Sequence, residues 1–165
     1  MGRRYTKENY IETYKKLKEN VKNVCITTDI IVGFPGETEE DFQETLDLVN
    51  SCKFDGAFTF AYSKRTNTPA SIMKNQVPEE IKLERLNKLN KIVNQYSLNS
   101  NNYYIGKIVI VLIFDICQKD NNKLVGYSEQ MKLVNVVGDK NLIGKIVDVK
   151  ITDAKSFSID GEVLE

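Results

Sequence analysis

The fold of the first half of the chain is decided by the stretch Thr27-Thr28-Asp29-Ile30-Ile31-Val32-Gly33-Phe34-Pro35-Gly36-Glu37-Thr38-Glu39-Glu40-Asp41-Phe42. Its apolar residues 30–32 predict a strand that is covered on both faces. Two glycines and a proline in residues 33–36 end that strand, because glycine reaches unusual backbone angles and proline lacks an amide donor. Thr38 predicts a helix cap, with Asp41 in the capping-box position. The turn would lie at the carboxyl end of a parallel sheet, where α/β enzymes keep their chemistry, although an ordinary βα unit fits the same residues.

The pattern on either side of this stretch alternates helices with strands. Five elements are predicted: helices over residues 6–20, 39–50 and 78–96, and strands over 24–32 and 57–62. Two apolar strands with three amphipathic helices do not close a sheet, and both strands keep unpaired edges. Residues 1–99 are therefore expected to be a piece of a larger barrel whose other strands lie outside this chain.

The longest predicted helix opens at Pro78, a favoured residue of the first helical turn. Its buried stripe is expected to be Ile81, Leu86, Leu89, Val93 and Tyr96. The asparagine-rich residues 99–102 are predicted to be a linker. This divides the chain into two domains, residues 1–99 and 100–165.

After the linker the pattern changes to short strands. Residues 104–115 and 142–153 carry the same amino acid at 8 of 12 positions, which predicts two similar strands that are each entered through a glycine. Further strands are predicted at residues 124–128, 133–138 and 156–159. Five short strands in about 60 residues indicate an OB-like barrel, a shape that often binds unpaired nucleic acid.

The composition excludes several classes of function. The 165 residues are 41% apolar and 28% charged, as in a soluble globular protein. No apolar run approaches the roughly 20 residues of a membrane helix, and the first residues lack the apolar core of a signal peptide. A cytoplasmic protein is expected. The 23 basic and 23 acidic side chains give no global attraction to nucleic acid, so an RNA surface would have to come from local clustering.

The chain offers few groups for catalysis. It has no histidine, and Cys25, Cys52 and Cys117 lack the spacing of metal ligands. Histidine-based triads and most zinc sites are thereby removed. The sequence predicts free thiols, no catalytic residue and no metal ligand.

Several motifs together resemble one known family. Residues 28–38 resemble the signature late in the barrel of the radical S-adenosylmethionine methylthiotransferases. Residues 54–70 and 76–79 are similar to the MiaB-type tRNA methylthiotransferases in particular. Residues 105–107 and 144–158 resemble the TRAM domain that closes such proteins. The resemblance covers essentially the whole chain.

This resemblance implies an α/β fold: a partial radical SAM barrel over residues 1–99, then a five-stranded OB-like TRAM barrel over residues 100–165. It implies the C-terminal part of an enzyme that adds a methylthio group to N6-isopentenyladenosine beside the tRNA anticodon. The complete enzyme would use S-adenosyl-L-methionine and two [4Fe-4S] clusters. The C-x-x-x-C-x-x-C motif of the radical cluster is absent here. The chain alone is therefore expected to be inactive without the N-terminal part that completes the barrel.

The resemblance also implies the residues of two sites. The cofactor-binding residues would be Asp29, Gly33, Pro35, Gly36, Glu37, Phe60, Tyr62 and Ser63. For Phe60, a place in the barrel core is an equal alternative. The residues that meet tRNA phosphates would be Lys107, Lys145, Lys150 and Lys155.

Three other interpretations stay open. One is a sister methylthiotransferase that acts on threonylcarbamoyladenosine or on a ribosomal protein. Another is a non-enzymatic RNA-binding module, and the third is a remnant without activity. Cluster assembly and cleavage of S-adenosylmethionine would distinguish an enzyme from the RNA-binding module and from the remnant. Binding of tRNA by the tail would distinguish the RNA-binding module from the remnant.

Overall fold

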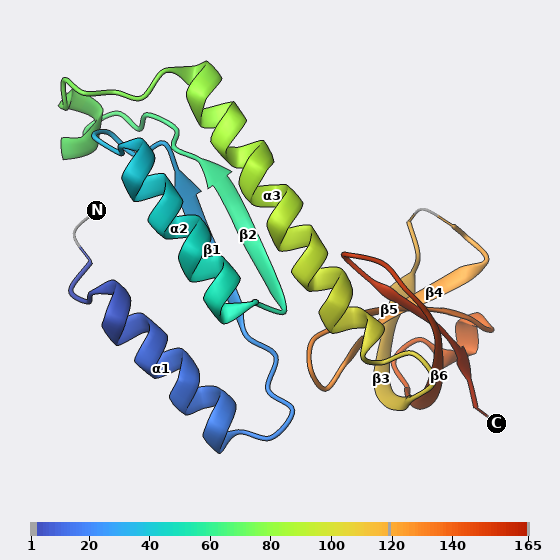
Figure 1. The fold of residues 1–165 in the computed structure, drawn as a ribbon. Helices are drawn as coiled ribbons and strands as arrows, with labels where there is room; N and C mark the ends of the chain where they lie inside the picture. The colour runs from blue at the N-terminus through green and yellow to red at the C-terminus, as the bar shows by residue number, and fades with distance from the viewer. Residues whose placement is uncertain (1–2, 119, 165) are drawn as a thin grey trace. The chain divides into compact units, whose positions relative to one another are not determined.

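The computed structural model describes residues 3–118 and 120–164. The chain forms two compact units, Met1–Val93 and Asn94–Glu165. Figure 1 shows the elements in order: α1 (Lys7–Asn20), β1 (Thr27–Val32), α2 (Glu39–Cys52), β2 (Gly56–Ala61), η1 (Pro69–Ile72), α3 (Glu79–Asn102), β3 (Ile108–Ile116), β4 (Lys123–Ser128), β5 (Leu133–Val137), η2 (Lys140–Leu142), β6 (Ile146–Ala154) and β7 (Ile159–Val163).

The first two helices begin at the predicted caps. The Thr38 hydroxyl accepts from the Asp41 amide at 3.1 Å, and the Asp41 carboxylate accepts from the Thr38 amide at 2.9 Å, which completes the capping box of α2. Thr6 and Asn9 form the same box at α1. Both caps are confirmed, because each orphan amide finds a local side chain.

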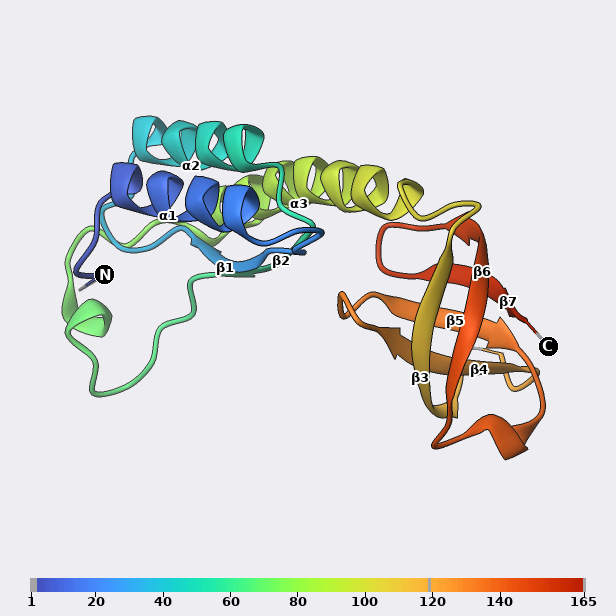
Figure 2. The same cartoon turned by 90° about the horizontal axis from the view of Figure 1, so that it is seen from below.

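The sheet of the first unit has two parallel strands, β1 and β2, paired from Thr27↔Gly56 to Val32↔Ala61. The strand predicted from residue 24 begins three residues later, because the Ile26 amide donates to the Asp55 carboxylate at 2.8 Å instead of joining the ladder. Figure 2 shows α1, α2 and α3 on one side of this sheet. Its core contains Phe42, Leu46, Val49, Phe54 and Leu89.

The other face of this sheet is uncovered among the described residues. Phe58 and Phe60 are 63% and 52% exposed, and Ile31 and Asp29 are exposed beside them. Apolar strands that lack a cover on one face and partners at both edges are typical of a sheet that continues elsewhere. This agrees with the expectation of a larger barrel.

The third helix corrects two predictions. The predicted linker at residues 99–102 is wrong, because α3 continues to Asn102 and the Asn101 side chain donates to the Lys155 carbonyl at 2.6 Å. The predicted stripe is partly wrong, because Ile81 is exposed. The buried positions of α3 are Lys82, Arg85, Leu89, Val93, Ser97 and Asn101. The domain boundary after residue 99 stays a prediction.

The second unit is a closed barrel with the strand order β3-β4-β5-β7-β6. All neighbouring strands are antiparallel except β5 and β7, which are parallel. Of the strand predicted at residues 156–159, residues 156–158 form the turn before β7, because the Lys155 amide donates to the Ser158 carbonyl at 2.8 Å, and only Ile159 belongs to a strand. The buried core contains Tyr104, Val111, Ile113, Leu124, Val134, Val136, Val149, Ile151 and Ile159. The OB-like barrel is confirmed.

The internal repeat of the sequence is also a repeat of the structure. Gly106 and Gly144, which precede β3 and β6, have φ of +81° and +85°. The Gly106 amide donates to the Ile151 carbonyl and the Gly144 amide to the Ile113 carbonyl, each at 2.8 Å. Since β3 and β6 are antiparallel neighbours, each glycine turn lies at the far end of the other repeat's strand.

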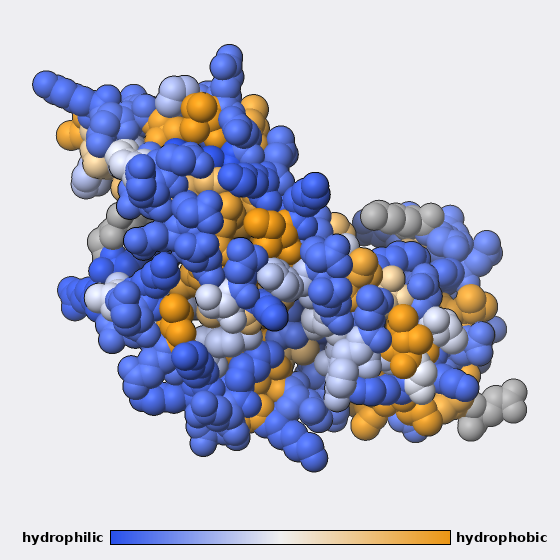
Figure 3. Space-filling model, in the orientation of Figure 1, coloured by the Kyte–Doolittle hydropathy of each residue, from blue (hydrophilic) through white to orange (hydrophobic). Residues whose placement is uncertain are grey.

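Among the described residues, no helix is both long and apolar enough to cross a bilayer. Figure 3 shows a largely hydrophilic surface that apolar patches interrupt on both units.

Candidate functional site

The loop between β1 and α2 carries four of the predicted cofactor-binding residues. Gly33 and Gly36 have φ of +72° and +89°, which side chains with a Cβ rarely adopt. The Gly36 amide donates to the Asn75 carbonyl at 2.8 Å, and the Glu37 amide donates to the Phe34 carbonyl at 2.9 Å. Pro35 is buried. The loop therefore has a defined shape.

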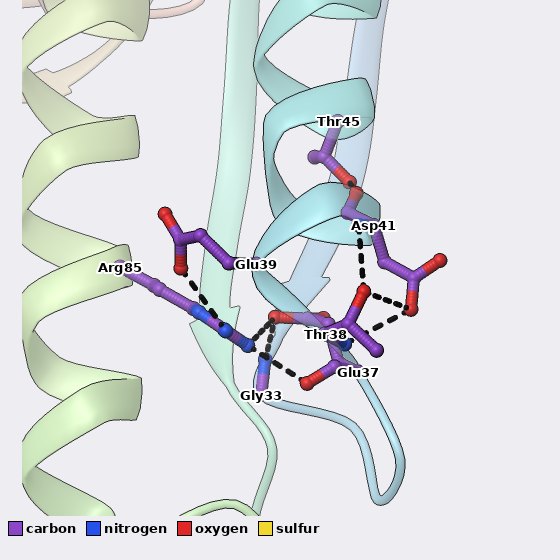
Figure 4. Close-up of polar contacts among 7 residues, drawn as sticks. All are labelled: Gly33, Glu37, Thr38, Glu39, Asp41, Thr45 and Arg85. Atoms are coloured by element: carbon purple, nitrogen blue, oxygen red, sulfur yellow. Dashed lines mark hydrogen bonds and ion pairs between the residues drawn. The ribbon is translucent and has the colours of Figure 1, made fainter.

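An ion pair holds this loop to α3 (Figure 4). Glu37 Oε1 accepts from the Gly33 amide and from Arg85 Nη1, both at 2.8 Å, and Nη1 also reaches the Glu37 carbonyl at 3.2 Å. The side chains of Arg85 and Glu37 are only 8% and 12% exposed. Buried charges are tolerated where they are paired and hydrogen-bonded. The Glu37 carboxylate therefore stabilises the turn by hydrogen bonds to the Gly33 amide and to Arg85.

Arg85 makes further contacts around the start of α2. Its Nη2 lies 3.2 Å from Glu39 Oε2, and its guanidinium carbon lies 5.4 Å from the centre of the Phe42 ring. Its Nε atom is buried without a hydrogen-bond partner among the described residues. The sequence interpretation missed Arg85. The helical spacing of positions 82, 85, 89 and 93 could have placed it on the buried face, but its charge suggested solvent.

A second basic side chain, Lys82, lies under the loop. A Cβ at Gly33 would stand 2.3 Å from Lys82 Cγ, so a glycine is needed there. Lys82 Nζ lies 2.7 Å from the Glu79 carboxylate and 5.4 Å from the centre of the Tyr62 ring. The Tyr62 hydroxyl is buried without a partner among the described residues, and the ring packs edge-on against Phe34 at 5.3 Å. Tyr62 thus lies against the loop.

The structure separates the remaining predicted cofactor-binding residues. Asp29 and Phe60 lie on the uncovered face of the sheet, where Asp29 pairs with Phe58 and Phe60 with Ile31 in the register of β1 and β2. Ser63 is exposed beyond the end of β2. One group of residues therefore forms the loop, and a second group faces outward from the sheet.

The thiols do not form a cluster site. Cys25, Cys52 and Cys117 form no disulfide with one another, and the part of the chain that the structure describes groups no three His, Cys, Asp or Glu side chains that could hold a metal ion. Burial raises the pKa of the Cys52 thiol, which disfavours the thiolate that iron would require. Iron–sulfur clusters need several thiolates at one place, so these residues do not fit one.

The four predicted RNA-binding lysines are exposed, but they differ in their partners. Lys107 Nζ lies 2.8 Å from the centre of the Tyr103 ring. Lys155 Nζ lies 2.6 Å from Asp160 Oδ2, which Lys123 Nζ also approaches at 3.4 Å. The hydrogen bond to Asp160 raises the pKa of Lys155. Its charge is thus already paired within the barrel.

Asp160 is the acidic centre of this cluster. Burial alone would raise its pKa, but hydrogen bonds from Lys155 and from the Asn135 side chain outweigh burial and lower it. Lys145 and Lys150 are exposed, and the ion pair and the ring contact described above involve the other two lysines. The structure places Lys107 and Lys150 together at one end of the β3–β6 ladder, since Lys107 adjoins Ile108 and Lys150 pairs with Ile108.

Comparison with known proteins finds a family match within each unit. Residues 1–49 match the Radical SAM superfamily, and residues 102–164 match the TRAM domain. The tRNA-2-methylthio-N(6)-dimethylallyladenosine synthase of Alkaliphilus oremlandii is 52% identical over 165 residues, which are 100% of this chain and 35% of that protein. The synthase of the same name from Clostridium tetani is 53% identical over 162 residues, 98% of this chain and 36% of that protein.

A third synthase of this name, from Bacillus mycoides, is 50% identical over 165 residues, 100% of this chain and 32% of that protein. The chain thus spans about a third of the length of the curated relatives it matches. Over its whole length the chain is homologous to a part of the tRNA-2-methylthio-N(6)-dimethylallyladenosine synthases, with a radical SAM segment followed by a TRAM domain.

Proposed function

We propose that this chain is the C-terminal part of a cytoplasmic enzyme that adds a methylthio group to N6-isopentenyladenosine beside the tRNA anticodon. The observation that carries this proposal is the identity of about half of all residues, along the whole chain, to synthases named for that product. Those names favour this substrate over the threonylcarbamoyladenosine or ribosomal protein of sister enzymes.

The first unit would contribute one side of the S-adenosylmethionine site. The proposed lining residues are Asp29, Gly33, Pro35, Gly36, Glu37, Phe60, Tyr62 and Ser63. Two features support this assignment: the loop of residues 33–37 is held rigidly, and Asp29 and Phe60 face outward from the sheet. Glu37 would act by shaping the loop, because Oε1 is engaged by Gly33 and Arg85. Bound next to a reduced [4Fe-4S] cluster, S-adenosylmethionine supplies the radical chemistry of such enzymes.

The chain would be inactive alone, because its three thiols are not grouped and both edges of its sheet lack partners among the residues that the structure describes. Its partner would be the N-terminal part of the enzyme, which supplies the remaining strands and the cluster ligands. The second unit would bind the anticodon stem-loop of tRNA through Lys107, Lys145 and Lys150, with Lys155 contributing less because Asp160 neutralises it.

A chimera tests the proposed function. This chain replaces the matching part of the Alkaliphilus oremlandii synthase in cells that lack the endogenous enzyme, and the tRNA nucleosides are measured by mass spectrometry. We expect 2-methylthio-N6-isopentenyladenosine to appear. A chimera that folds and assembles its clusters but leaves isopentenyladenosine unmodified would contradict the proposal.

A non-enzymatic RNA-binding module is the second candidate function. The observation in its favour is that the barrel closes on itself and has its own core, so it needs no missing strand. An inactive chimera together with salt-dependent binding of tRNA by the chain would support this candidate over the enzyme.

A further inference from the structure

Over residues 108–115 and 146–153, the two copies of the internal repeat differ on one face only. Equivalent positions of β3 and β6 are 38 residues apart, and the inward ones carry the same amino acids. Val109, Val111 and Ile113 of β3 correspond to Val147, Val149 and Ile151 of β6. The outward positions Ile110, Leu112 and Phe114 are replaced by Asp148, Lys150 and Thr152. Both strands share the same alternation of burial along their nine residues. Beyond the shared exposed residues Ile108 and Ile146, the outer face of β6 is therefore polar, whereas that of β3 is apolar.

The outward side chains of β3 form an exposed apolar row. Ile108, Ile110, Leu112 and Phe114 are between 44% and 61% exposed. Tyr127 of β4 extends the row, because its ring stacks on Phe114 with centres 5.1 Å apart and planes 15° apart. We name these five residues the β3 outer face. A strand that is apolar on both faces is typical of one that is covered on both.

The charges around the β3 outer face fit a ligand with negative groups at its two ends and neutral groups between them. Lys107 and Lys150 lie at one end of the ladder. Lys145 lies at the other end, where its carbonyl accepts from the Ile113 amide at 3.0 Å. Between them, Asp148 pairs with Ile110. This carboxylate repels phosphate from the centre but can accept a hydrogen bond from a base amino group.

We propose that the β3 outer face binds unpaired RNA bases. This deepens the RNA-binding role proposed above and rests on it. Bases stack on the exposed surfaces of Phe114 and Tyr127 and cover the aliphatic side chains, while the flanking phosphates lie near the lysines at the two ends. Aromatic side chains on an exposed sheet commonly hold two or three bases of single-stranded RNA in this way.

The second repeat supplies the test variant. In the full chain, I110D/L112K/F114T gives β3 the outward residues of β6 and leaves the inward residues unchanged. The substitutions add one acidic and one basic group, so the net charge stays the same. A fluorescent RNA hairpin with an unpaired anticodon-type loop is titrated against both proteins at several salt concentrations.

We expect the triple variant to bind the hairpin at least tenfold more weakly, since stacking contributes about 1–3 kcal/mol for each base. The slope of log K against log salt should not change, because no phosphate contact is removed. The control variant Lys145→Gln should instead reduce that slope by about one unit. Phe114→Leu keeps the apolar row without the ring and should lie between the wild type and the triple variant, and it carries the test if the triple variant fails to fold.

Unchanged affinity of the folded triple variant would overturn the proposal, while a reduced slope for Lys145→Gln would leave the phosphate role intact. If neither variant changes binding, both the β3 outer face and Lys145 lie outside the RNA site and the proposal fails, whereas a wild-type chain that does not bind the hairpin at all would overturn the RNA-binding role itself. Sedimentation of both proteins without RNA tests the competing occupant, a second copy of this chain. A wild-type dimer that the triple variant abolishes would assign the β3 outer face to self-association and overturn RNA binding there.

Discussion

The barrel and the two-stranded sheet solve the same problem in opposite ways. In the barrel every strand has two partners and the inward side chains form one core. Among the described residues, β1 and β2 have one partner each, and the face of the sheet away from the helices is exposed. A closed barrel removes its edges, whereas an open sheet depends on what covers it.

The two units also differ in how far their ion-paired charges are exposed to solvent. In the barrel, the side chain of Asp160 is 14% exposed, but those of its partners Lys123 and Lys155 are 31% and 58% exposed. In the sheet unit, the Arg85–Glu37 pair is buried beneath a loop at the end of a strand. A buried pair of this kind is weak evidence for net stability, but it specifies one loop conformation.

The largest expected effect concerns the barrel core. Ile113→Ala removes a fully buried side chain and should destabilise the barrel by about 4 kcal/mol. Ile151→Ala, its equivalent in the second repeat, should cost the same. Hydrogen exchange followed by mass spectrometry should show faster exchange in β3 to β7 and unchanged exchange in β1 and β2. The control Ile110→Ala, on the outer face, should cost less than about 0.5 kcal/mol. Equal loss of protection in both units would contradict the conclusion that the barrel has a core of its own.

The next effect concerns the buried ion pair. Arg85→Met leaves the Glu37 carboxylate without its cation and should destabilise the sheet unit by about 3 kcal/mol. The Gly33 amide should exchange faster with deuterium, because its acceptor is no longer held in place. Glu12→Gln breaks the exposed pair with Lys16 and is the matched control, with an expected loss below about 0.5 kcal/mol. Equal effects of the two variants would show that burial of the pair does not matter.

A smaller effect separates the two capped helices. Thr38→Ala removes the cap of α2, which carries four buried side chains, and should destabilise the sheet unit by about 1 kcal/mol. Thr6→Ala removes the same cap from α1, which buries none of its residues completely. Circular dichroism should show fraying of α1 without a shift in the melting of the unit. A larger shift for Thr6→Ala would mean that α1 supports the sheet more than its burial indicates.

The smallest effect is the pH dependence of the barrel. Because the folded-state pKa of Asp160 is lowered, its contribution is complete above the usual pKa of about 4 and is lost as the pH falls through the lower folded value. The raised pKa of Lys155 gives the opposite sign at alkaline pH, with stability lost as the pH rises above about 10.5. Urea unfolding at several pH values should show both limits. Asp160→Asn should flatten the curve by less than about 1 kcal/mol at each limit.

Local signals in the sequence predicted the local structure. Thr38 and Asp41 are three residues apart, and the capping box they form needs no distant partner. The repeat at residues 104–115 and 142–153 predicted two equivalent strands because the inward side chains and the glycine turns are the same in both.

Long-range pairing explains what the sequence could not show. Arg85 lies 48 residues from Glu37, and a charged side chain on a helix ordinarily faces water, so its place in the buried stripe was missed. The predicted linker failed for a similar reason, since Asn101 bonds to a carbonyl 54 residues away. Of the predicted cofactor-binding residues, those in the loop of residues 33–37 are neighbours in the sequence, so the sequence alone places them together. The pairing of Phe60 with Ile31 depended on the register of two strands, which the sequence does not encode locally.

The apolar row along β3 also has a consequence for biosynthesis. Residues 108–114 form an uninterrupted apolar run of high β propensity, the kind of segment that nucleates aggregates while a chain is still unfolded. Charged residues stand at its two limits, Lys107 before the run and Asp115 after it. Charges in such positions act as gatekeepers against intermolecular strand pairing. Replacing both charged residues with neutral ones would therefore lower the yield of soluble protein while leaving the free energy of unfolding of the folded chain nearly unchanged.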